Sequence, residues 1–595
     1  MLDHLIRRAT VVDGTGSSPY TADVGIRDGR IASIDTGTVK AGRIGERARS
    51  EEDAHGLVLA PGFIDPHTHY DAQLFWDPYA TPSMAHGVTT VLGGNCGFSL
   101  APLRAADADY TRRMMSKVEG MSLAALEQGA PWDWSSFGDY LAALDGRTAV
   151  NAGFMAGHCA LRRHAMGPAA LGGIPDDEQL RAMETRLHEA LEAGAWGLST
   201  TRSTTHTDGD GNPVASRHAR PEELLALCRV VGEHPGTQLE AIVPGCLGRF
   251  TDEETRLLTA MSTAAGRPVN WNVLTIDAAR PEAVAHQLAT GERARADGGR
   301  VVALTMPILT PMNMSLGSFC ALNLIPGWGE ILALPVPRRI DRLRQPAVQQ
   351  ELLRRARSEE AGVFRRLADF ARYVIGDTYA KENDGLTGRV VADIAAERGL
   401  DPFDCLVEIC AADELRTVLW PMPTDNDPAS WELRRRTWHH PDVLLGGSDA
   451  GAHLDRMCGA PYPTRFLGDC LRGRRLVPLE QAVRMLTDDP ARLFGLRERG
   501  RIAKGWWADL VLFDPLRIDA GAATLVHDLP GAAARLDSRA VGVVSVRVNG
   551  VETVRHDVLT GAVPGVVLRS GRDTETVSTG AGGQDASPTS AQAQF

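Results

Sequence analysis

The sequence predicts an α/β protein: a (β/α)8 TIM-like barrel with a small β-sandwich domain formed by both chain ends. Eight β-rich runs alternate with longer helical patterns through the middle of the chain, which is typical of parallel sheets built from βα units. Both ends are rich in short strand patterns instead. The length of 595 residues exceeds what one simple hydrophobic core supports, so we expect a large domain with a smaller one beside it.

The eight predicted barrel strands each combine a short apolar run with a flanking turn or helix signal. They cover residues 63–70, 89–96, 149–158, 195–200, 237–243, 268–275, 301–308 and 443–449. Helical patterns precede most of them, for example at residues 176–193 and 221–233. Eight such units in one domain indicate a (β/α)8 barrel over residues 59–490.

The interval between the seventh and eighth strands is too long for one loop. Residues 309–385 contain Met- and Pro-rich turns, followed by a charged helical run at residues 345–373. We interpret this segment as an insertion over the mouth of the barrel, where long loops commonly serve binding. The alternative is a packing helix remote from the site.

The two ends of the chain are predicted to share one small β domain. Residues 1–58 carry strand runs with Asp-Gly turn signals, and residues 491–571 return to β-rich patterns at 508–515 and 541–549. From residue 572 to 595, Gly, Ser, Thr, Ala and Gln dominate, so this tail is predicted to be disordered.

Composition excludes several classes of partner. The net charge of -12 disfavours nucleic acid and anionic membranes, and we expect neither as a partner. There is no basic region followed by an apolar segment at the N-terminus, and no run of about 18 apolar residues. The nine cysteines form no Cys-x-x-Cys pair, which fits a reducing cytoplasm. We therefore expect a cytoplasmic protein, and a homo-oligomer is compatible with the sequence.

The strongest chemical signal is His67-Thr68-His69, which follows an apolar run at the first predicted strand. Side chains alternate across a strand, so the two imidazoles share one face, roughly 6.5–7 Å apart along it. Imidazole is the commonest neutral metal ligand, so the pair suits one metal ion. The alternative is a pair of surface or capping histidines.

Other strand ends carry metal-competent side chains as well. Active sites of (β/α)8 barrels lie at the C-terminal ends of the strands, where this sequence places Cys96, His158, Glu240, Asp449 and His453. At the eighth strand, a carboxylate such as Asp449 can accept a proton from a metal-activated water, although Asp also caps helices. A Cys96 thiolate would favour zinc, but buried cysteines are often plain packing residues.

The motifs that carry a family resemblance lie at residues 61–71, 94–102, 194–200, 447–449 and 499–511. Together they resemble the amidohydrolase superfamily, and more narrowly its N-acyl-D-amino-acid deacylase (D-aminoacylase) family, as a divergent member. The resemblance implies a zinc-dependent barrel in which Cys96 is a zinc ligand and Asp449 the general base. His67 and His69 correspond to the paired ligands of the first strand.

The chain departs from that family pattern at two strands. The family places metal-binding histidines at the ends of strands five and six, whereas residues 238–243 and 269–274 contain none. Glu240 could replace one ligand, while Asn272 is a poor zinc ligand and better suited to substrate or water. We therefore predict one or two Zn²⁺ ions, or another divalent metal, held by His67, His69, Cys96, Glu240 and Asp449.

Substrate-binding residues are predicted around this metal site. Arg162 or Arg202 could hold a carboxylate, because a guanidinium offers a bidentate fork. His158 could orient a carboxylate or carbonyl, although a structural histidine explains it equally well. Residues 201–206 also differ from the family and suggest a changed pocket. Asn272 and His453 complete the predicted substrate-binding set.

The predicted activity is metal-dependent hydrolysis of a small linear amide, such as an N-acyl amino acid or a related N-acyl compound. A cyclic-amide hydrolase resembling hydantoinases is a second interpretation. Such enzymes usually bridge two metals with a carboxylated lysine, and no lysine lies near the end of the fourth strand. A barrel without metal, acting as a binding module, is the third.

Overall fold

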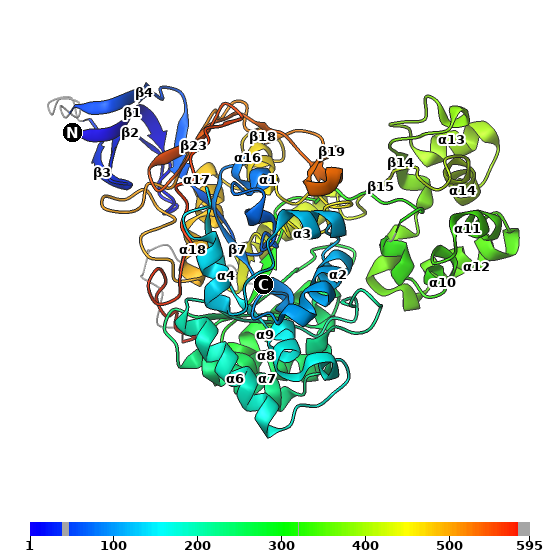
Figure 1. Ribbon diagram of the computed structural model, residues 1–595. Helices are drawn as coiled ribbons and strands as arrows, with labels where there is room; N and C mark the ends of the chain where they lie inside the picture. Colours follow the sequence, from blue (N-terminus) through cyan, green and yellow to red (C-terminus); the bar gives the residue numbers. More distant parts are fainter. Residues whose placement is uncertain (38–46, 319, 581–595) are drawn as a thin grey trace.

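The computed structural model describes residues 1–37, 47–318 and 320–580. Figure 1 shows three parts: a β-rich region that contains the N-terminus, a central body of strands and helices, and a helical lobe on the side away from the N-terminus. No helix in these described ranges combines the length and apolar character needed to cross a bilayer.

The central body contains parallel strands at all eight predicted places. Their bounds are β6 (Phe63–Asp65), β7 (Val88–Gly93), β8 (Asn151–Phe154), β9 (Ala156–Gly157), β10 (Gly197–Thr201), β11 (Gln238–Ile242), β12 (Val269–Trp271), β13 (Val301–Thr305) and β16 (Val443–Leu445). The first three form one sheet in the order β6-β7-β8, and the others pair in the order β9-β10-β11-β12-β13-β16. The third predicted strand is therefore split into β8 and β9.

Backbone contacts link these two sheets at both junctions. Only Met155 separates β8 from β9, and the Met155 N–H donates to the Gly93 carbonyl at 3.0 Å. At the other junction Thr68, just after β6, forms a parallel bridge with Ala450, just after β16. The residues that follow the first and eighth strands therefore lie side by side, which positions the site described below.

Amphipathic helices cover the outside of the parallel strands (Figure 1). The predicted helices at 176–193 and 221–233 are confirmed as α6 (Asp177–Glu192) and α7 (Pro221–Gly232). Asp176 begins α6 with a capping box, because its carboxylate accepts from the Gln179 N–H and the Gln179 side chain accepts in return. Met183, Leu187 and Leu191 form the buried stripe of α6 at helical spacing.

Strands from both chain ends form one nine-stranded sheet in the order β24-β23-β22-β17-β5-β1-β2-β3, with β4 paired to β1. The bounds are β1 (Leu2–Val11), β2 (Tyr20–Arg27), β3 (Arg30–Asp35), β4 (Ala48–Asp53), β5 (Val58–Pro61), β17 (Leu510–Phe513), β22 (Val543–Val548), β23 (Val551–Arg555) and β24 (Val558–Leu559). The junction is the antiparallel pairing of β5 with β17. Glu52 of β4 adds a second link between the two chain ends through ion pairs to Arg547 of β22 and Arg555 of β23.

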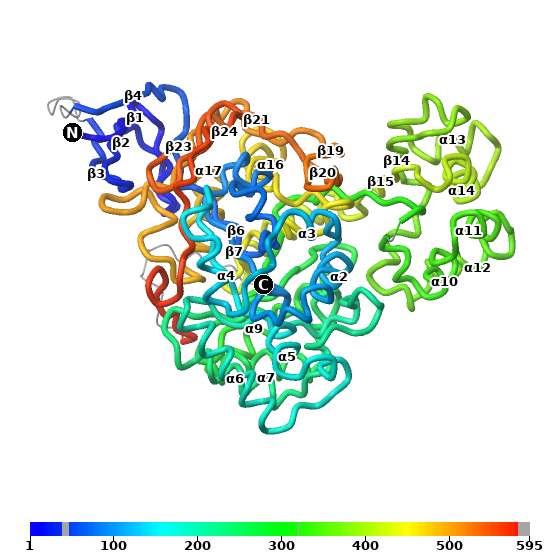
Figure 2. Tube along the Cα trace, in the orientation of Figure 1, coloured from blue at the N-terminus to red at the C-terminus, as the bar shows by residue number. Residues whose placement is uncertain are grey.

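The helical lobe has its own hydrophobic core, which runs from Met314 to Leu419 and includes the fully buried Trp328. Its main elements are α10 (Trp328–Leu332), α11 (Val336–Leu343), α12 (Pro346–Arg357), β14 (Tyr373–Ile375), α13 (Val391–Arg398), α14 (Pro402–Ala412) and β15 (Leu419–Pro421). Figure 2 shows the chain leaving the central body for this lobe and returning from it. The lobe thus extends well past residue 385, where the sequence places the end of the insertion.

The long helical run predicted at residues 345–373 is wrong in its second half. The α-helix ends at Arg357, the backbone becomes extended at Ser358, and short 3₁₀ turns follow with Gly362 at a φ of 54°. Tyr373 then begins β14. The charged residues gave this segment a helical pattern, but the extended backbone at Ser358 breaks it.

The first residues of the predicted disordered tail pack against the central body. Thr574 is fully buried; its hydroxyl donates to the Gly236 carbonyl at 2.7 Å and accepts from the Gly571 N–H at 3.2 Å. The Glu575 N–H donates to the Gly495 carbonyl at 2.8 Å. Residues 572–577 are therefore ordered, contrary to the prediction, and residues 581–595 lie outside the described part of the chain.

Candidate functional site

His67 and His69 lie directly after β6 on a segment held from both sides. The Thr68 N–H and hydroxyl both donate to the Leu92 carbonyl, and the His69 N–H donates to the Ala450 carbonyl at 2.7 Å. Both imidazoles are buried, and their ring centroids are 5.3 Å apart in an edge-to-face arrangement. The predicted convergence of the two histidines is therefore present in the structure.

Cys96 approaches the same point from the end of β7. It lies in a tight turn at a φ of 56°, after Gly94 at a φ of 73°. Gly94 is required there because a Cβ atom would collide with the Met155 backbone. The Cys96 Sγ lies 3.5 Å from His67 Nε2 and 4.0 Å from His69 Nε2. The three ligand atoms lie within 4.8 Å of one another, which suits a single metal ion.

Asp449 faces both histidines from the segment after β16. Its Oδ1 lies 3.2 Å from His67 Nε2 and 3.9 Å from His69 Nε2, and accepts a hydrogen bond from Asn272 Nδ2 at 3.1 Å. The side chain is 23% exposed whereas that of His67 is fully buried, so Asp449 borders the opening of the site. Burial, helped by the Asp65 carboxylate, raises the pKa of Asp449 to about 7.

Glu240, on β11, lies against Cys96. Its Oε2 accepts the Cys96 N–H at 2.9 Å, and its Oε1 is buried without a hydrogen-bond partner in the described ranges. Burial raises the pKa of Glu240 well above its usual value, and the Asp449 charge acts in the same direction. A buried carboxylate with one free oxygen fits a cation-binding role.

The protonation of the other groups is set mainly by burial. Burial lowers the pKa of His69 to about 3 and that of His67 well below its usual value, so both rings are neutral and can offer a lone pair. Burial, followed by the charges of Glu240 and Glu119, raises the pKa of the Cys96 thiol well above its usual value. A thiolate in this acidic pocket therefore requires a cation beside it.

Glu119 also lies at this site, although no sequence pattern pointed to it. It follows α2 (Ala108–Val118), is 2% exposed, and places Oε1 3.6 Å from His69 Nδ1. Burial raises its pKa well above the usual value, with further contributions from Asp449 and Asp71. It carries no motif and follows no strand, so only the three-dimensional arrangement brings it to His69.

The structure does not support the predicted substrate-binding roles of His158 and Arg162. Glu223 accepts hydrogen bonds from both: Oε1 lies 2.9 Å from His158 Nε2, and Oε2 accepts from Arg162 Nη1. His158 Nδ1 also lies 2.9 Å from the Thr200 hydroxyl, and Arg162 Nη2 donates to the Gly173 carbonyl at 2.8 Å. Both side chains are fully buried, so this network is structural.

The remaining predicted substrate-binding residues are Asn272, Arg202 and His453, each of which follows a parallel strand. Asn272 contacts Asp449 directly, and its Oδ1 is buried without a hydrogen-bond partner among the described residues. Arg202 follows β10, is half-buried, and donates from Nη1 to the Ala219 carbonyl at 3.2 Å. His453 follows Asp449 by four residues, and its Nδ1 lies 3.2 Å from Arg456 Nη2.

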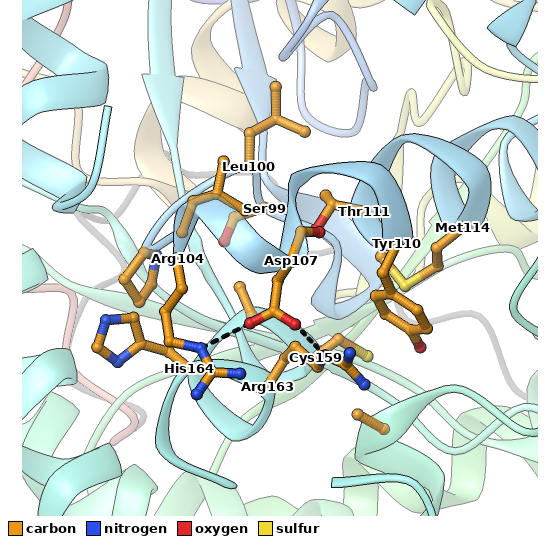
Figure 3. Close-up of a pocket in the computed structure, with 14 residues that line it drawn as sticks. Ser99, Leu100, Arg104, Asp107, Tyr110, Thr111, Met114, Cys159, Arg163 and His164 are labelled. Atoms are coloured by element: carbon orange, nitrogen blue, oxygen red, sulfur yellow. Dashed lines mark hydrogen bonds and ion pairs between the residues drawn. The ribbon is translucent and has the colours of Figure 1, made fainter. Parts of the chain in front are cut away.

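A separate hollow lies between the loop that follows Cys96 and the helices α2 and α5 (His158–Met166), as Figure 3 shows. Asp107 projects into it and accepts hydrogen bonds from Arg104 Nε at 2.6 Å and Arg163 Nε at 2.7 Å. None of the predicted metal ligands lines this hollow. Its charged groups are paired with one another, so we assign it no chemical role.

Comparison with known proteins agrees with this geometry. A family model described as "Amidohydrolase family" matches residues 50–556. D-aminoacylase of Alcaligenes xylosoxydans xylosoxydans is 30% identical over 575 residues, which cover 95% of this chain and 97% of that protein. N-acyl-D-glutamate deacylase of the same organism is 30% identical over 86% of this chain and 87% of its own length.

Solved structures give the same result. A crystal structure of D-aminoacylase is 27% identical, with a TM-score of 0.62, and the match covers 96% of this chain and all of the other. N-acyl-D-glutamate deacylase from Bordetella bronchiseptica, solved with zinc and a phosphonate inhibitor, is 28% identical with a TM-score of 0.61 and the same coverage. The family match over most of the chain and the 30% identity to D-aminoacylase together show that this chain belongs to the amidohydrolase family.

Proposed function

We propose that this protein is a zinc-dependent deacylase that hydrolyses small linear N-acyl compounds, with N-acyl amino acids as the first candidates. One observation carries the proposal: two neutral imidazoles and a thiol converge within 4.8 Å, and the Asp449 carboxylate lies 3.2 Å from one of them. The relatives act on this class of amide, since they include a D-aminoacylase and N-acyl-D-aspartate and N-acyl-D-glutamate deacylases.

The residues present fit a zinc ion. His67 Nε2, His69 Nε2 and Cys96 Sγ would hold it, with Asp449 and the free Oε1 of Glu240 as further oxygen ligands for one ion or two. Nitrogen and sulfur donors together favour zinc over magnesium or calcium. A bound zinc ion supplies Lewis-acid polarisation of the amide carbonyl and makes water a stronger nucleophile.

Proton transfer falls to Asp449 in this mechanism. The hydrogen bond from Asn272 fixes one carboxylate oxygen, and the exposed part of the side chain faces the opening. Asp449 takes a proton from the attacking water and returns it to the nitrogen of the leaving amine. The same carboxylate must accept and then release a proton, which a partly exposed group at the edge of the site can do.

Substrate binding is assigned to three residues around the opening. Arg202 would hold a carboxylate through its remaining guanidinium donors, since Nη1 makes a single backbone hydrogen bond. The Oδ1 of Asn272 would accept the substrate amide N–H, which gives this buried oxygen a partner. His453, four residues after Asp449, would contact the acyl side.

We also infer the architecture around the site. The links at Met155 and at Thr68 support a closed (β/α)8 barrel over residues 59–490. Residues 1–58 and 491–571 would form the small β-sandwich domain, since strands from both ends share one sheet and Leu510 and Leu512 of β17 pack in a cluster separate from the main core. The helical lobe would be the insertion at the barrel mouth.

The nine buried, unpaired cysteines support a reducing, cytoplasmic location. The net charge of -12 supports the expectation that nucleic acid is not a partner.

Metal analysis and a substrate panel test the proposal. We expect purified protein to hold one or two zinc ions and to release amine from N-acyl-D- or N-acyl-L-amino acids. Asp449→Asn should still bind zinc through His67, His69 and Cys96 but lose at least about 100-fold in kcat. Asp109→Asn makes the same chemical change at an exposed position on α2 and should leave activity unchanged. A protein that cannot be loaded with metal, or undiminished hydrolysis by Asp449→Asn, would overturn the mechanism.

A further inference from the structure

Glu119 contacts the edge of the His69 ring that points away from Cys96 and Asp449. His69 Nε2 faces Cys96 Sγ at 4.0 Å and Asp449 Oδ1 at 3.9 Å, whereas His69 Nδ1 faces Glu119 Oε1 at 3.6 Å. Neither Nδ1 atom has a hydrogen-bond partner among the described residues, but the one on His69 has the Glu119 carboxylate beside it at ion-pair distance. His69 Nδ1 and Glu119 are therefore placed to interact, at a distance somewhat longer than a hydrogen bond.

The backbone of Glu119 is fixed by two different segments. Its N–H donates to the Met115 carbonyl at 2.9 Å as the last hydrogen bond of α2, and its carbonyl accepts the N–H of His453. His453 belongs to the segment that begins at Asp449. Glu119 therefore joins α2, the His69 ring and the segment that carries the general base.

An ionised carboxylate at this position is costly for three separate reasons. The side chain is 2% exposed, so the charge is removed from water. It lies at the C-terminal end of a helix, where the helix dipole disfavours negative charge. Asp449 and Asp71 are close enough to repel it, and Arg456 is the cation that opposes them. A glutamine would fill the same space without these costs, so packing alone does not explain the acid.

We propose that Glu119 is a positioning residue for the metal centre: its carboxylate holds the proton of His69 on Nδ1 and so directs the Nε2 lone pair at the metal. Its negative charge offsets part of the metal's positive charge. Carboxylates that bind the far nitrogen of a ligating histidine are known to fix its tautomer and raise its basicity. The inference rests on the proposed metal centre but assigns a residue that contacts neither metal nor substrate.

The test is to compare Glu119→Gln with the wild type and with Glu223→Gln. Glu223 is an equally buried acid that also contacts a histidine, but it lies in the structural network of His158 and Arg162. Zn²⁺ affinity is measured by competition with a chelator, coordination by the absorption spectrum of the Co²⁺-loaded protein, and stability by thermal unfolding of the metal-free protein.

For Glu119→Gln we expect a Zn²⁺ dissociation constant about 10–100-fold higher, an altered Co²⁺ spectrum, and a metal-free melting temperature that is unchanged or higher. Glu223→Gln should do the opposite, with unchanged Zn²⁺ affinity and a lower metal-free melting temperature. Unchanged Zn²⁺ affinity in Glu119→Gln, or a loss of stability without a change in affinity, would overturn the inference.

A second variant covers the case in which Glu119→Gln does not fold. Glu119→Asp keeps the charge but withdraws the carboxylate from His69 Nδ1, so we expect its Zn²⁺ affinity to fall as well. Wild-type affinity in Glu119→Asp would refute the positioning role. If the wild-type protein itself binds no metal, the proposed function fails, and this outcome is distinct from a failure of the Glu119 inference.

Discussion

Removing the charge of Glu223 should destabilise the protein strongly without impairing substrate binding. Glu223 and Arg162 are both buried, at 4% and 0% exposure, and form an ion pair. Glu223→Gln leaves the Arg162 guanidinium buried with the Gly173 carbonyl as its remaining hydrogen-bond partner among the described residues. His158 keeps an acceptor, because the glutamine carbonyl can replace the carboxylate oxygen.

The size of the effect follows from that burial. Breaking a buried ion pair by removing one partner costs about 3–5 kcal/mol, because the other charge stays buried and uncompensated. For a domain larger than 250 residues, about 2 °C is lost per kcal/mol, so the melting temperature should fall by roughly 6–10 °C. Replacing both partners in Arg162→Met/Glu223→Gln removes the buried charge and should restore most of this loss.

Differential scanning calorimetry measures the melting temperatures, and steady-state kinetics with an N-acyl amino acid measure KM. We expect KM to stay within about twofold of the wild-type value in Arg162→Met, because the Arg162 guanidinium is fully buried and already bonded to Glu223 and to the Gly173 carbonyl. The opposite pattern, with wild-type stability and a KM raised tenfold or more, would show that Arg162 binds substrate and that our structural assignment is wrong.

Three further outcomes are expected. Cys96→Ser should weaken Zn²⁺ binding by at least about tenfold in a chelator competition, since a hydroxyl is a poorer zinc ligand than a thiolate; equal affinity would remove Cys96 from the metal site. Thr574→Val should lower the free energy of unfolding by about 1–3 kcal/mol, because the Gly236 carbonyl loses a buried donor; an unchanged denaturant midpoint would contradict this. Burial lowers the pKa of His86 to about 4 in the folded protein. As the pH falls below about 6.5, His86 therefore binds a proton in the unfolded chain before it does so in the folded one. The free energy of unfolding should therefore fall by about 3 kcal/mol between pH 6.5 and 4, and His86→Gln should have a shallower pH dependence; identical slopes would refute the assignment.

The sequence predicted the parallel strands well because their signals are local. Each strand is a short apolar run next to a turn, and eight such runs can be recognised in the sequence without knowledge of distant contacts. The lobe was less predictable. Its helix α12 ends at Arg357 although charged, helix-forming residues continue, because the extended backbone at Ser358 and the conformation of Gly362 depend on packing within the lobe.

The residues of the site likewise fall into those that the sequence predicts and those that it does not. His67, His69, Cys96 and Asp449 each follow a strand that the sequence revealed, so the shared C-terminal edge of the parallel strands brings them together. The ion pair of Arg162 could not be predicted, because its partner Glu223 lies 61 residues away along the chain. Glu119 was missed for a related reason, since a glutamate at the end of a helix is ordinary until its contact with His69 is known.

The pairing of β5 with β17 has a consequence for how this chain is made. Pro61 pairs with Leu510, so more than four hundred residues separate the two partners along the chain. At about 5–20 residues per second, a ribosome needs on the order of half a minute to synthesise that interval. Until then β5 exposes an unpaired edge just before β6 and the histidines that follow it, and such edges promote aggregation. Newly made protein therefore depends on this edge staying protected, and synthesis at a lower temperature or with added chaperones should increase the soluble yield.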